Sequence, residues 1–375
     1  MKKFSFVIPA YNCKSMLKSS LEALNCQKGY SYGQYEVIVV DDGSSDDTWE
    51  YIKGVNKNYE LKYIYLKREG CSCRARARNF GWKSAEGEVI VFIDADIIVK
   101  DTHLVELERF YKYESNLAVM GLRLMLPRGA VIDFDYLYQI YDFDRKKLTL
   151  LDKTYFIYNL LSYNISKIRS PGILYATNNC TVPTKILESI NGFDENYIGY
   201  GYEDQDLAFR LLKLDNMKFA LNHKLEVLHQ YHPHRDYVDE EFKANGKLFY
   251  GKFPLAEGNI PMTKEVDIWG AAGMSDEEFL KRFEYKCHQE DKKVIVDYSD
   301  RKDIEQIKER ILTLSEQEGL DIVVNDYVEQ DDLDIWIQLI GKRKSTPKYF
   351  PMSKRIAKLS TAEREWIRFQ QQQTW

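Results

Sequence analysis

The chain has 375 residues, of which 44% are hydrophobic and 30% charged, a balance typical of a globular protein with one large domain plus a smaller unit. Its formal net charge of -5 argues against a general nucleic-acid binder. Six scattered cysteines are too few for a disulfide framework and indicate a reducing, cytoplasmic setting. No apolar run reaches the roughly 18 residues of a membrane span, which leaves peripheral contact with the inner membrane face open.

The first part of the chain alternates predicted strands and helices. Short β-branched or aromatic runs predict strands at 4–8, 36–40, 61–66 and 88–93. One helix is expected between the first two strands, capped by Asn12, and another between the second and third, with Trp49 and Ile52 facing inward. This βαβαβ order predicts an α/β fold with a doubly wound, mostly parallel sheet. Ligands of such sheets bind at the carboxyl ends of the strands.

Acidic residues stand at these carboxyl ends. The first strand is followed by "PAYN" rather than a glycine-rich dinucleotide fingerprint, and the second by "DDGSSDD". The fourth is followed by Asp94 and Asp96, with apolar runs on both sides. Unpaired buried carboxylates are costly, so these two are expected to meet a cation or hydrogen-bond donors. Oxygen ligands of this kind suit Mg²⁺ or Mn²⁺.

A second acidic cluster lies in "NGFDENYIGYGYEDQDLAFRLLKLDN", residues 191–216. Its six acids are Asp194, Glu195, Glu203, Asp204, Asp206 and Asp215. One interpretation is a solvated loop that feeds a helix, whose first turn favours negative charge. The other is a catalytic segment, in which Gly199 and Gly201 let the loop approach a ligand closely. Leucines at helical spacing after residue 206 predict that the helix buries its far side.

Four motifs together carry a resemblance to a known family. They are "VIPAYN" at 7–12, "VVDDGSSDDT" at 39–48, "ARNFGWKSAEGEVIVFIDADI" at 77–97 and "NGFDENYIGYGYEDQDLAFRL" at 191–211. In this order they resemble the family-2 glycosyltransferases, which have the GT-A fold. The last motif is most similar to that of the galactosyl- and N-acetylgalactosaminyl-transferring members. The resemblance covers roughly residues 4–235, the size of a nucleotide-sugar domain.

The resemblance implies a nucleotide-sugar site. The residues that match are Pro9, Tyr11, Asp41, Asp42, Arg78, Asp94 and Asp96. In the family, the ring at Tyr11 stacks on uracil and the carboxylate at Asp42 accepts its imide N–H. A packed core tyrosine is the alternative for Tyr11. Arg74 and Arg78 share a helix face by spacing, which fits either a diphosphate clamp or a solvated basic helix start.

The same resemblance implies a metal ligand set. Asp94 matches the position that meets the ribose and a metal-bound water, and Asp96 matches the ligand of a Mn²⁺ or Mg²⁺ ion bridging the diphosphate. His229, at the end of an apolar run, matches a further ligand, with His232 and His234 as rivals. The H-x-x-H-x-H spacing could instead suggest zinc, but neither a cysteine nor a fourth ligand is near.

The acidic motif is expected to supply the catalytic groups. In an inverting transfer a carboxylate must take the proton of the acceptor hydroxyl, and Asp204 matches the family's base. Glu203 would accept hydrogen bonds from acceptor or sugar hydroxyls, and Tyr200 and Tyr202 would floor the sugar site. Asp206 suits either participation or a helix start.

Composition and pattern predict the domain organisation. Residues 1–250 form the catalytic domain, 251–290 a linker or helical connection, 291–341 a small β-α-β-β unit, and 342–375 a helical tail. In the small unit, "LDIWIQLI" at 333–340 alternates and predicts a strand. This unit carries no catalytic motif. It is expected to pack, to form a homo-oligomer, or to recognise an acceptor.

The residues and the resemblance together predict a metal-dependent, inverting glycosyltransferase of polysaccharide biosynthesis. It would move a hexose or N-acetylhexosamine from a UDP-sugar to a hydroxyl of a glycan, peptide or protein. A non-catalytic protein that binds nucleotide or glycan is one alternative. Another is a sugar-phosphate nucleotidyltransferase, but that would carry a glycine-rich triphosphate loop where this chain has "PAYNCKS".

Overall fold

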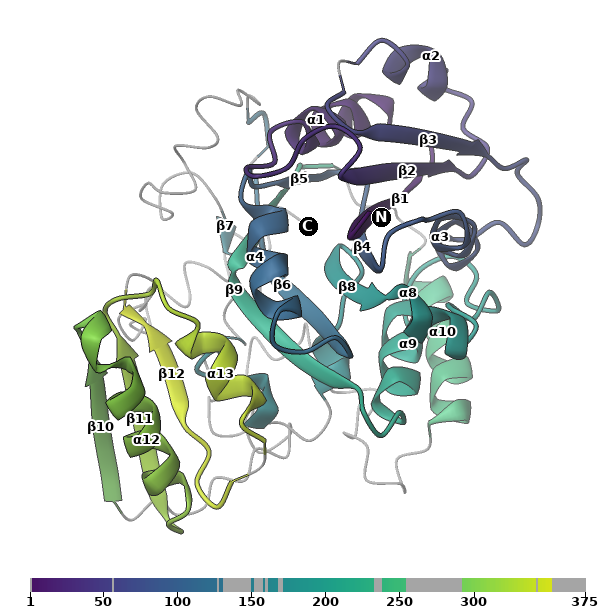
Figure 1. The fold of residues 1–375 in the computed structure, drawn as a ribbon. Coiled ribbons are helices and arrows are strands. Elements are labelled where there is room, and N and C mark those ends of the chain that lie inside the picture. Colours follow the sequence, from purple (N-terminus) through teal and green to yellow (C-terminus); the bar gives the residue numbers. More distant parts are fainter. Residues whose placement is uncertain are drawn as a thin grey trace.

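The computed structural model has one large and one small β-sheet, each flanked by helices (Figure 1). It describes residues 2–55, 57–126, 128–130, 150–151, 158, 161–167, 171–232, 238–253, 292–341 and 343–352. The large sheet has the strand order β3-β2-β1-β4-β8-β6-β9-β5, and β7 pairs with β6. The predicted α/β fold class is confirmed.

The first half of the large sheet is parallel. Its elements are β1 (Phe4–Ala10), α1 (Lys14–Leu24), β2 (Tyr35–Asp41), α2 (Thr48–Ile52), β3 (Glu60–Tyr65), α3 (Arg74–Lys83) and β4 (Val89–Ile93). Strand β1 pairs with β2 and β4, and β2 pairs with β3. Every residue of β2 and β4 is buried, as expected for apolar strands covered on both faces. The four predicted strands are confirmed, and the carboxyl ends of β1, β2 and β4 meet at one edge.

Two local predictions in this half are wrong. Asn12 does not cap the first helix; it has a φ of 49°, and its side-chain oxygen accepts a hydrogen bond from the Ser45 N–H at 2.8 Å. Asn12 therefore ties the loop after β1 to the loop after β2. Trp49 does not face inward but is 43% exposed, and its ring lies against Tyr63 of β3, whereas Thr48 and Ile52 are the buried residues of α2.

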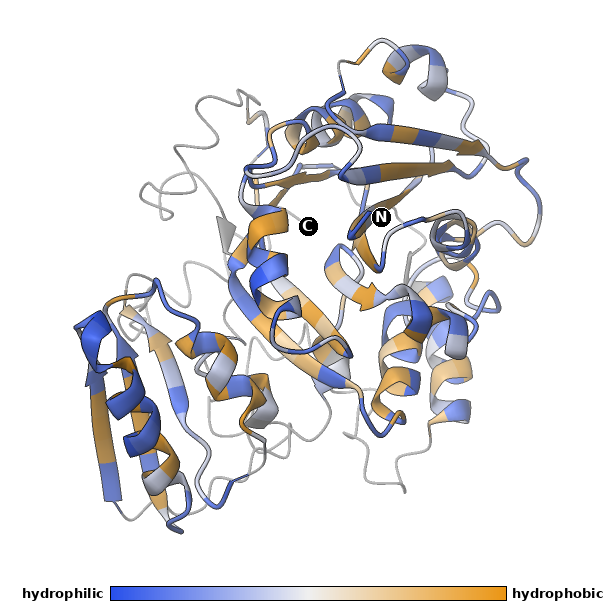
Figure 2. Cartoon of the chain, in the orientation of Figure 1, coloured by the Kyte–Doolittle hydropathy of each residue, from blue (hydrophilic) through white to orange (hydrophobic). Residues whose placement is uncertain are grey.

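The second half of the large sheet is mixed. Its elements are β5 (Ile97–Val99), α4 (His103–Tyr111), β6 (Leu117–Met125), β7 (Leu150–Leu151), β8 (Asn179–Pro183), α8 (Thr184–Ser189), α9 (Glu203–Leu212), β9 (Lys218–His229) and α10 (Val238–Lys252). Two short 3-10 helices, Ile165–Lys167 and Pro171–Leu174, precede β8. Strand β8 runs antiparallel to β4 and β6, whereas β6 and β9 are parallel. Figure 2 shows that the central strands are largely hydrophobic.

The C-terminal unit has a three-stranded parallel sheet, in the order β10-β11-β12. Its elements are β10 (Lys292–Tyr298), a 3-10 turn (Arg301–Asp303), α12 (Ile304–Ser315), β11 (Leu320–Asp326), α13 (Leu333–Leu339) and β12 (Lys348–Pro351). The predicted strand at 333–340 is wrong, since this segment is helix α13. Its two polar residues, Asp334 and Gln338, are four apart and share one helix face, while the surrounding apolar residues are buried on several sides.

Helix α13 joins the C-terminal unit to the large sheet. Gln338 donates to the Leu221 carbonyl at 2.8 Å and accepts from the Leu221 N–H at 2.7 Å, so it pairs with the backbone of β9. Asp334, 2% exposed, accepts from Arg109 of α4 at 3.1 Å. Packing within one chain is therefore one role of the unit. The predicted homo-oligomer and acceptor roles stay predictions.

Some predictions fall on residues that are not described. Most of the linker at 251–290 and all of the tail beyond residue 352 lie outside the described residues, as does His234. Among the residues that are described, no helix combines the length and hydrophobicity needed to cross a membrane.

Candidate active site

The loop after β2 is shaped by the first of its two aspartates. Asp41 is 1% exposed; it accepts from the Ser44 N–H at 2.7 Å and from the Tyr63 hydroxyl. The turn continues through Gly43, whose φ of 83° and whose distance to the Arg68 backbone leave no room for a side chain. Asp41 thus acts on the shape of the loop, and its two oxygens are taken up by the Ser44 N–H and the Tyr63 hydroxyl.

The second aspartate, Asp42, lies beside the guanidinium of Arg68, which stacks on the ring of Tyr11. Arg68 places its guanidinium 3.8 Å from the centre of the Tyr11 ring and donates to Asp42 at 2.7 Å. Burial raises the pKa of Asp42, although Ser72 and Arg68 act against this shift. Pro9, near the end of β1, pairs with Val40 beside this group. A flat group stacked on Tyr11 with its edge at Asp42 is the arrangement that a nucleobase requires, and Arg68 shows that the space accepts one.

Arg78 is the centre of a buried charge cluster. Its side chain comes from α3 and is 1% exposed. One terminal nitrogen donates to Asp94 at 2.9 Å, and the other donates to Glu203 at 3.1 Å and contacts Asp204 at 3.5 Å. Burial lowers the pKa of Arg78, but the three carboxylates outweigh this, and the net shift is upward. The structure therefore brings together residues from the end of β4 and the start of α9. Arg78 lies among carboxylates rather than on an open helix face beside Arg74.

Asp204 is the more accessible of the two acids that begin α9. Its side chain is 19% exposed, whereas that of Glu203 is 8% exposed. Thr177 donates to Asp204 twice, from its hydroxyl at 2.6 Å and from its N–H at 3.1 Å. Burial, followed by the nearby Glu203 charge, raises the pKa of Asp204 to about 6, with Arg78 and Thr177 opposing the rise. A carboxylate with this pKa is ionised at neutral pH and still basic enough to accept a proton.

Asp96 and two histidines form a second cluster. The antiparallel pairing of β5 with β9 places Ile97 opposite His229, so Asp96 lies beside the end of β9. The imidazoles of His229 and His232 approach the Asp96 carboxylate at 3.4 and 3.2 Å. One ligand atom from each of the three residues lies within 4.8 Å of the others, a spacing that could hold a metal ion. His229 and His232 are thus both placed where a metal ligand is predicted, and the role itself stays a prediction.

The protonation of this cluster suits a cation. The other Asp96 oxygen, Oδ1, is buried and has no hydrogen-bond partner among the described residues. Burial raises the pKa of Asp96, but the two histidines outweigh burial and lower it overall. Burial lowers the pKa of His229 and so favours its neutral, metal-binding form. Two nitrogen donors beside one carboxylate fit Mn²⁺ better than Mg²⁺, which prefers oxygen ligands alone.

The aromatic residues before α9 differ in their surroundings. Tyr202 is 6% exposed, and its ring centre lies 4.6 Å from that of Phe242 in α10. Gly201 has a φ of 95°, and a Cβ there would lie 2.6 Å from Phe242. The ring of Tyr202 therefore belongs to the core, and Gly201 admits helix α10 rather than a ligand. Only Tyr200, 37% exposed and 5.4 Å from the guanidinium of Arg74, has the exposure that the predicted acceptor role needs.

Asp206 has a structural environment. It is fully buried, and it accepts from Tyr197 at 3.1 Å, Lys252 at 2.9 Å and Arg210 at 2.7 Å. Lys252 ends α10, so this carboxylate fastens α10 to α9. Of the two interpretations of Asp206, the geometry favours the structural one.

Sequence reasoning did not find two residues that shape the site. Thr177 lies in a short loop before β8 and belongs to no motif, and Arg68 lies in the connection between β3 and α3. Both make their contacts across large distances in sequence. Thr177 meets a residue 27 positions away and Arg68 one 26 positions away, which no local spacing signals.

Two protein-family models match the chain. Residues 5–158 match the model described as glycosyl transferase family 2. Residues 162–234, which contain Thr177, Asp204 and His229, match the model described as the N-terminal domain of galactosyltransferase.

Individual proteins are also similar. An uncharacterised glycosyltransferase of Bacillus subtilis, YfnE, is 26% identical over 276 residues, which cover 65% of this chain and 68% of that protein. The Escherichia coli UDP-Glc:alpha-D-GlcNAc-diphosphoundecaprenol beta-1,3-glucosyltransferase WfaP is 35% identical over 122 residues, which cover 31% of this chain and 46% of WfaP. The matched region thus spans less than half of WfaP. The crystal structure of Staphylococcus aureus TarS 1–349 in complex with UDP-GlcNAc is 20% identical, with a TM-score of 0.48 over 75% of this chain and 72% of that one.

Proposed function

Residues 5–158 belong to glycosyl transferase family 2, within an α/β fold of the GT-A type, and from this premise we propose a metal-dependent, inverting transfer from a UDP-sugar. The sugar moved is a hexose or N-acetylhexosamine, and the acceptor is a hydroxyl of a glycan, peptide or protein. The observation that carries this proposal is the convergence of Asp94, Glu203 and Asp204 on Arg78, at the edge where strand-end ligands bind.

Asp204 acts as the general base in this proposal. It is more exposed than Glu203, and its pKa of about 6 lets it take a proton from an acceptor hydroxyl at neutral pH. Its Oδ2 retains accepting capacity beside the Thr177 N–H, because a carboxylate oxygen has two lone pairs, whereas Oδ1 meets both the Thr177 hydroxyl and Arg78. Glu203, more deeply buried against Arg78, orients hydroxyl groups and the guanidinium rather than accepting the proton.

The donor binds along the adjacent loops. Uracil stacks on Tyr11 with its edge at Asp42, and it takes the place that the Arg68 guanidinium occupies. Asp96, His229 and His232 hold a divalent ion, with Mn²⁺ favoured by the two nitrogen donors. A bound ion neutralises charge that develops on the leaving diphosphate. The unpaired cysteines among the described residues fit the proposed cytoplasmic setting, with peripheral membrane contact left to experiment.

Calorimetric titration of UDP with and without Mn²⁺ tests the metal and donor assignments together. The wild type is expected to bind UDP more tightly with Mn²⁺, and Asp96→Ala is expected to lose that difference. Asp101→Ala is the matched control, since Asp101 lies just after the other end of β5 and pairs with exposed Lys28. Equal Mn²⁺ dependence in the wild type and in Asp96→Ala would refute the ligand assignment. Replacing Mn²⁺ with Mg²⁺ or Zn²⁺ then ranks the ions.

A non-catalytic binding protein is the second candidate. Intact UDP binding without release of UDP from any UDP-sugar, in the presence of Mn²⁺ and a panel of acceptors, would favour it. The geometry argues for turnover, because a site that only binds has no physical need for an accessible carboxylate with a raised pKa.

A further inference from the structure

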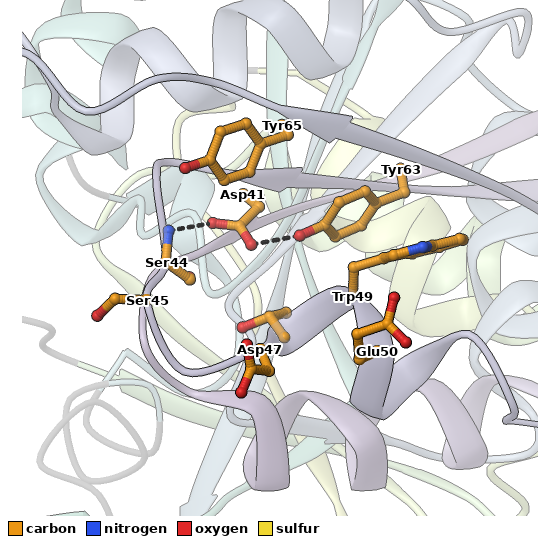
Figure 3. A pocket seen from close by; sticks show the side chains of 9 residues that line it. Asp41, Ser44, Ser45, Asp47, Trp49, Glu50, Tyr63 and Tyr65 are labelled. Carbon is orange, nitrogen blue, oxygen red and sulfur yellow. Dashed lines mark hydrogen bonds between the residues drawn. The ribbon is translucent and has the colours of Figure 1, made fainter.

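A shallow hollow of about 390 Å³ lies on the surface between β3 and α2 (Figure 3). Tyr63 and Tyr65 of β3 form one side, and Trp49 and Glu50 of α2 form another. The hollow shares only Asp41 with the residues assigned to the nucleotide.

Aromatic rings dominate the wall of this hollow. Trp49 is 43% exposed and Tyr65 is 59% exposed, and exposure of such large apolar rings to water is unfavourable in free energy. Tyr63 and Tyr65 are two residues apart on an edge strand and therefore point to the same face. The rings of Trp49 and Tyr63 lie 4.8 Å apart at 36°, so they pack against each other and hold one another in place. Aromatic rings gathered in this way suit contact with the apolar face of a ligand.

The polar groups of the hollow include three carboxylates beside the hydroxyls of Ser44, Ser45 and Thr48. Asp47 is exposed and has a φ of 57°, a conformation that is uncommon outside glycine. Glu50 stands on α2, with Lys53 as its ion-pair partner. Asp41 bonds to Tyr63 and fixes that ring in place. The hollow therefore offers flat apolar rings beside hydrogen-bond acceptors.

We propose that this hollow is a second carbohydrate subsite, which holds a neutral or amino-bearing sugar unit of a glycan acceptor. A pyranose presents an apolar C–H face to aromatic rings and hydroxyl donors at its edge, so both features of the hollow are used. The carboxylates repel anionic sugars. The choice of a glycan as ligand rests on the proposed transferase function.

The sugar bound here is not the one that reacts. Strand β3 lies three strand steps from β4, and a spacing of about 4.8 Å per step puts the hollow on the order of 15 Å from Asp94. The subsite would therefore hold a unit farther along the acceptor chain. It would favour long acceptors over short ones.

Binding of defined oligosaccharides to the full chain tests the subsite. The probes are neutral hexasaccharides of glucose, galactose, mannose and N-acetylglucosamine, with hexagalacturonate as the anionic probe, measured by calorimetry and saturation-transfer NMR. At least one neutral probe is expected to bind, and more tightly than hexagalacturonate. Trp49→Ala and Tyr65→Ala are each expected to weaken that binding by about tenfold or more, as loss of a stacking ring does.

Tyr32→Ala is the matched control, because Tyr32 is 64% exposed and does not line the hollow. Its affinity for the probes is expected to equal that of the wild type. The subsite is overturned if no neutral probe binds, or if both ring variants bind as the wild type does. UDP titration with Mn²⁺ on the same samples separates the two proposals. Retained UDP binding without glycan binding refutes the subsite alone, whereas ring-dependent glycan binding without UDP binding refutes the donor assignment and supports the subsite.

Discussion

The large and small sheets both end parallel strands in aspartates, yet they treat these carboxylates differently. In the small sheet, Asp326 accepts from the N–H groups of Val328 and Glu329 at 2.9 and 2.8 Å and from the Tyr349 hydroxyl at 2.9 Å. Its donors are mostly local, and they satisfy both oxygens. In the large sheet, Asp94 meets Arg78, which it shares with Glu203 and Asp204.

This difference indicates which strand-end aspartates belong to a functional site. Three carboxylates around one guanidinium leave two negative charges without a partner inside the cluster. Such an excess is costly in a buried place, and it is retained where a ligand or a reaction needs it. Asp326 occupies the same topological position in the small sheet, but it is a single carboxylate whose two oxygens both meet neutral hydrogen-bond donors. Strand-end aspartates are therefore not diagnostic by themselves; their donors are.

Asp204→Asn is expected to have the largest effect of the substitutions that test this comparison. Asparagine keeps the shape but removes the basicity, so transfer is expected to fall by about 10² to 10⁴ while UDP affinity barely changes. In the wild type, the rate should fall as pH drops through about 6, because the protonated Asp204 cannot accept the acceptor's proton. Burial and the Glu203 charge raise that pKa, whereas Arg78 and Thr177 lower it. Single-turnover transfer at saturating donor across pH is the measurement.

Glu203→Gln is the control for the assignment of the base. It is expected to weaken acceptor affinity more than it slows the chemical step, since its hydrogen bonds are made in both ground and transition states. An inactive Glu203→Gln beside an active Asp204→Asn would move the base by one residue. If both variants stay active, the acids of this segment are better explained as the acidic first turn of a helix, without a catalytic role.

Arg78→Met is the next largest effect, and it acts on stability. Methionine leaves the buried Glu203 and the partly exposed Asp94 and Asp204 without their cation, at an expected cost of about 3 kcal/mol in the free energy of unfolding. Urea denaturation at pH 8 measures this cost, which should shrink at pH 5 as carboxylates protonate. Arg74→Met, on the same helix but beside exposed Tyr200, should change the free energy by less than about 1 kcal/mol. Equal losses in the two variants would contradict a central role for Arg78.

The sequence predicted which residues lie at the edge of the sheet better than it predicted which side chains contact one another there. Apolar strands and the acids that follow them are local patterns, so the strands and the positions of Asp94 and Asp96 could be read directly. The partners of Arg78 lie 16, 125 and 126 residues away, so its helical spacing could not show that it faces carboxylates rather than phosphate.

The aromatic residues of the acidic motif show the same limit. A glycine-aromatic-glycine pattern indicates a close approach but not what approaches. Phe242, 40 residues after Tyr202, supplies the neighbour and turns a predicted sugar floor into core. In the C-terminal unit, helix α13 is buried on several sides, so its sequence does not separate into a polar and an apolar face. The alternating pattern of "LDIWIQLI" therefore predicted a strand.

Thr177→Val sharpens the comparison at a single hydrogen bond. Valine keeps the volume and the N–H donor but removes the hydroxyl that donates to Asp204 at 2.6 Å. The hydroxyl lowers the pKa of Asp204, so its loss should move the acid limb of the rate to higher pH by roughly one unit, which lowers transfer by about twofold at pH 7 and by about tenfold at pH 5. Thr177→Ser should restore both values. A Thr177→Val variant that is slower at every pH, with an unmoved limb, would show a merely structural role.

Asp326→Asn has the smallest expected effect. It tests the comparison in the small sheet, whose aspartate is expected to take no part in transfer. Asparagine retains an oxygen for the Val328 and Glu329 N–H groups, and the Tyr349 hydroxyl can rotate to accept from the new amide. Because the donors of Asp326 are neutral groups that asparagine can also meet, the free energy of unfolding should change by about 1 kcal/mol or less, and transfer should equal that of the wild type. Asp94→Asn, the same substitution at the end of a strand in the large sheet, should impair transfer. A loss of transfer in Asp326→Asn as deep as that in Asp94→Asn would mean that both sheets serve the reaction, and that saturation by local donors does not separate a structural carboxylate from a working one.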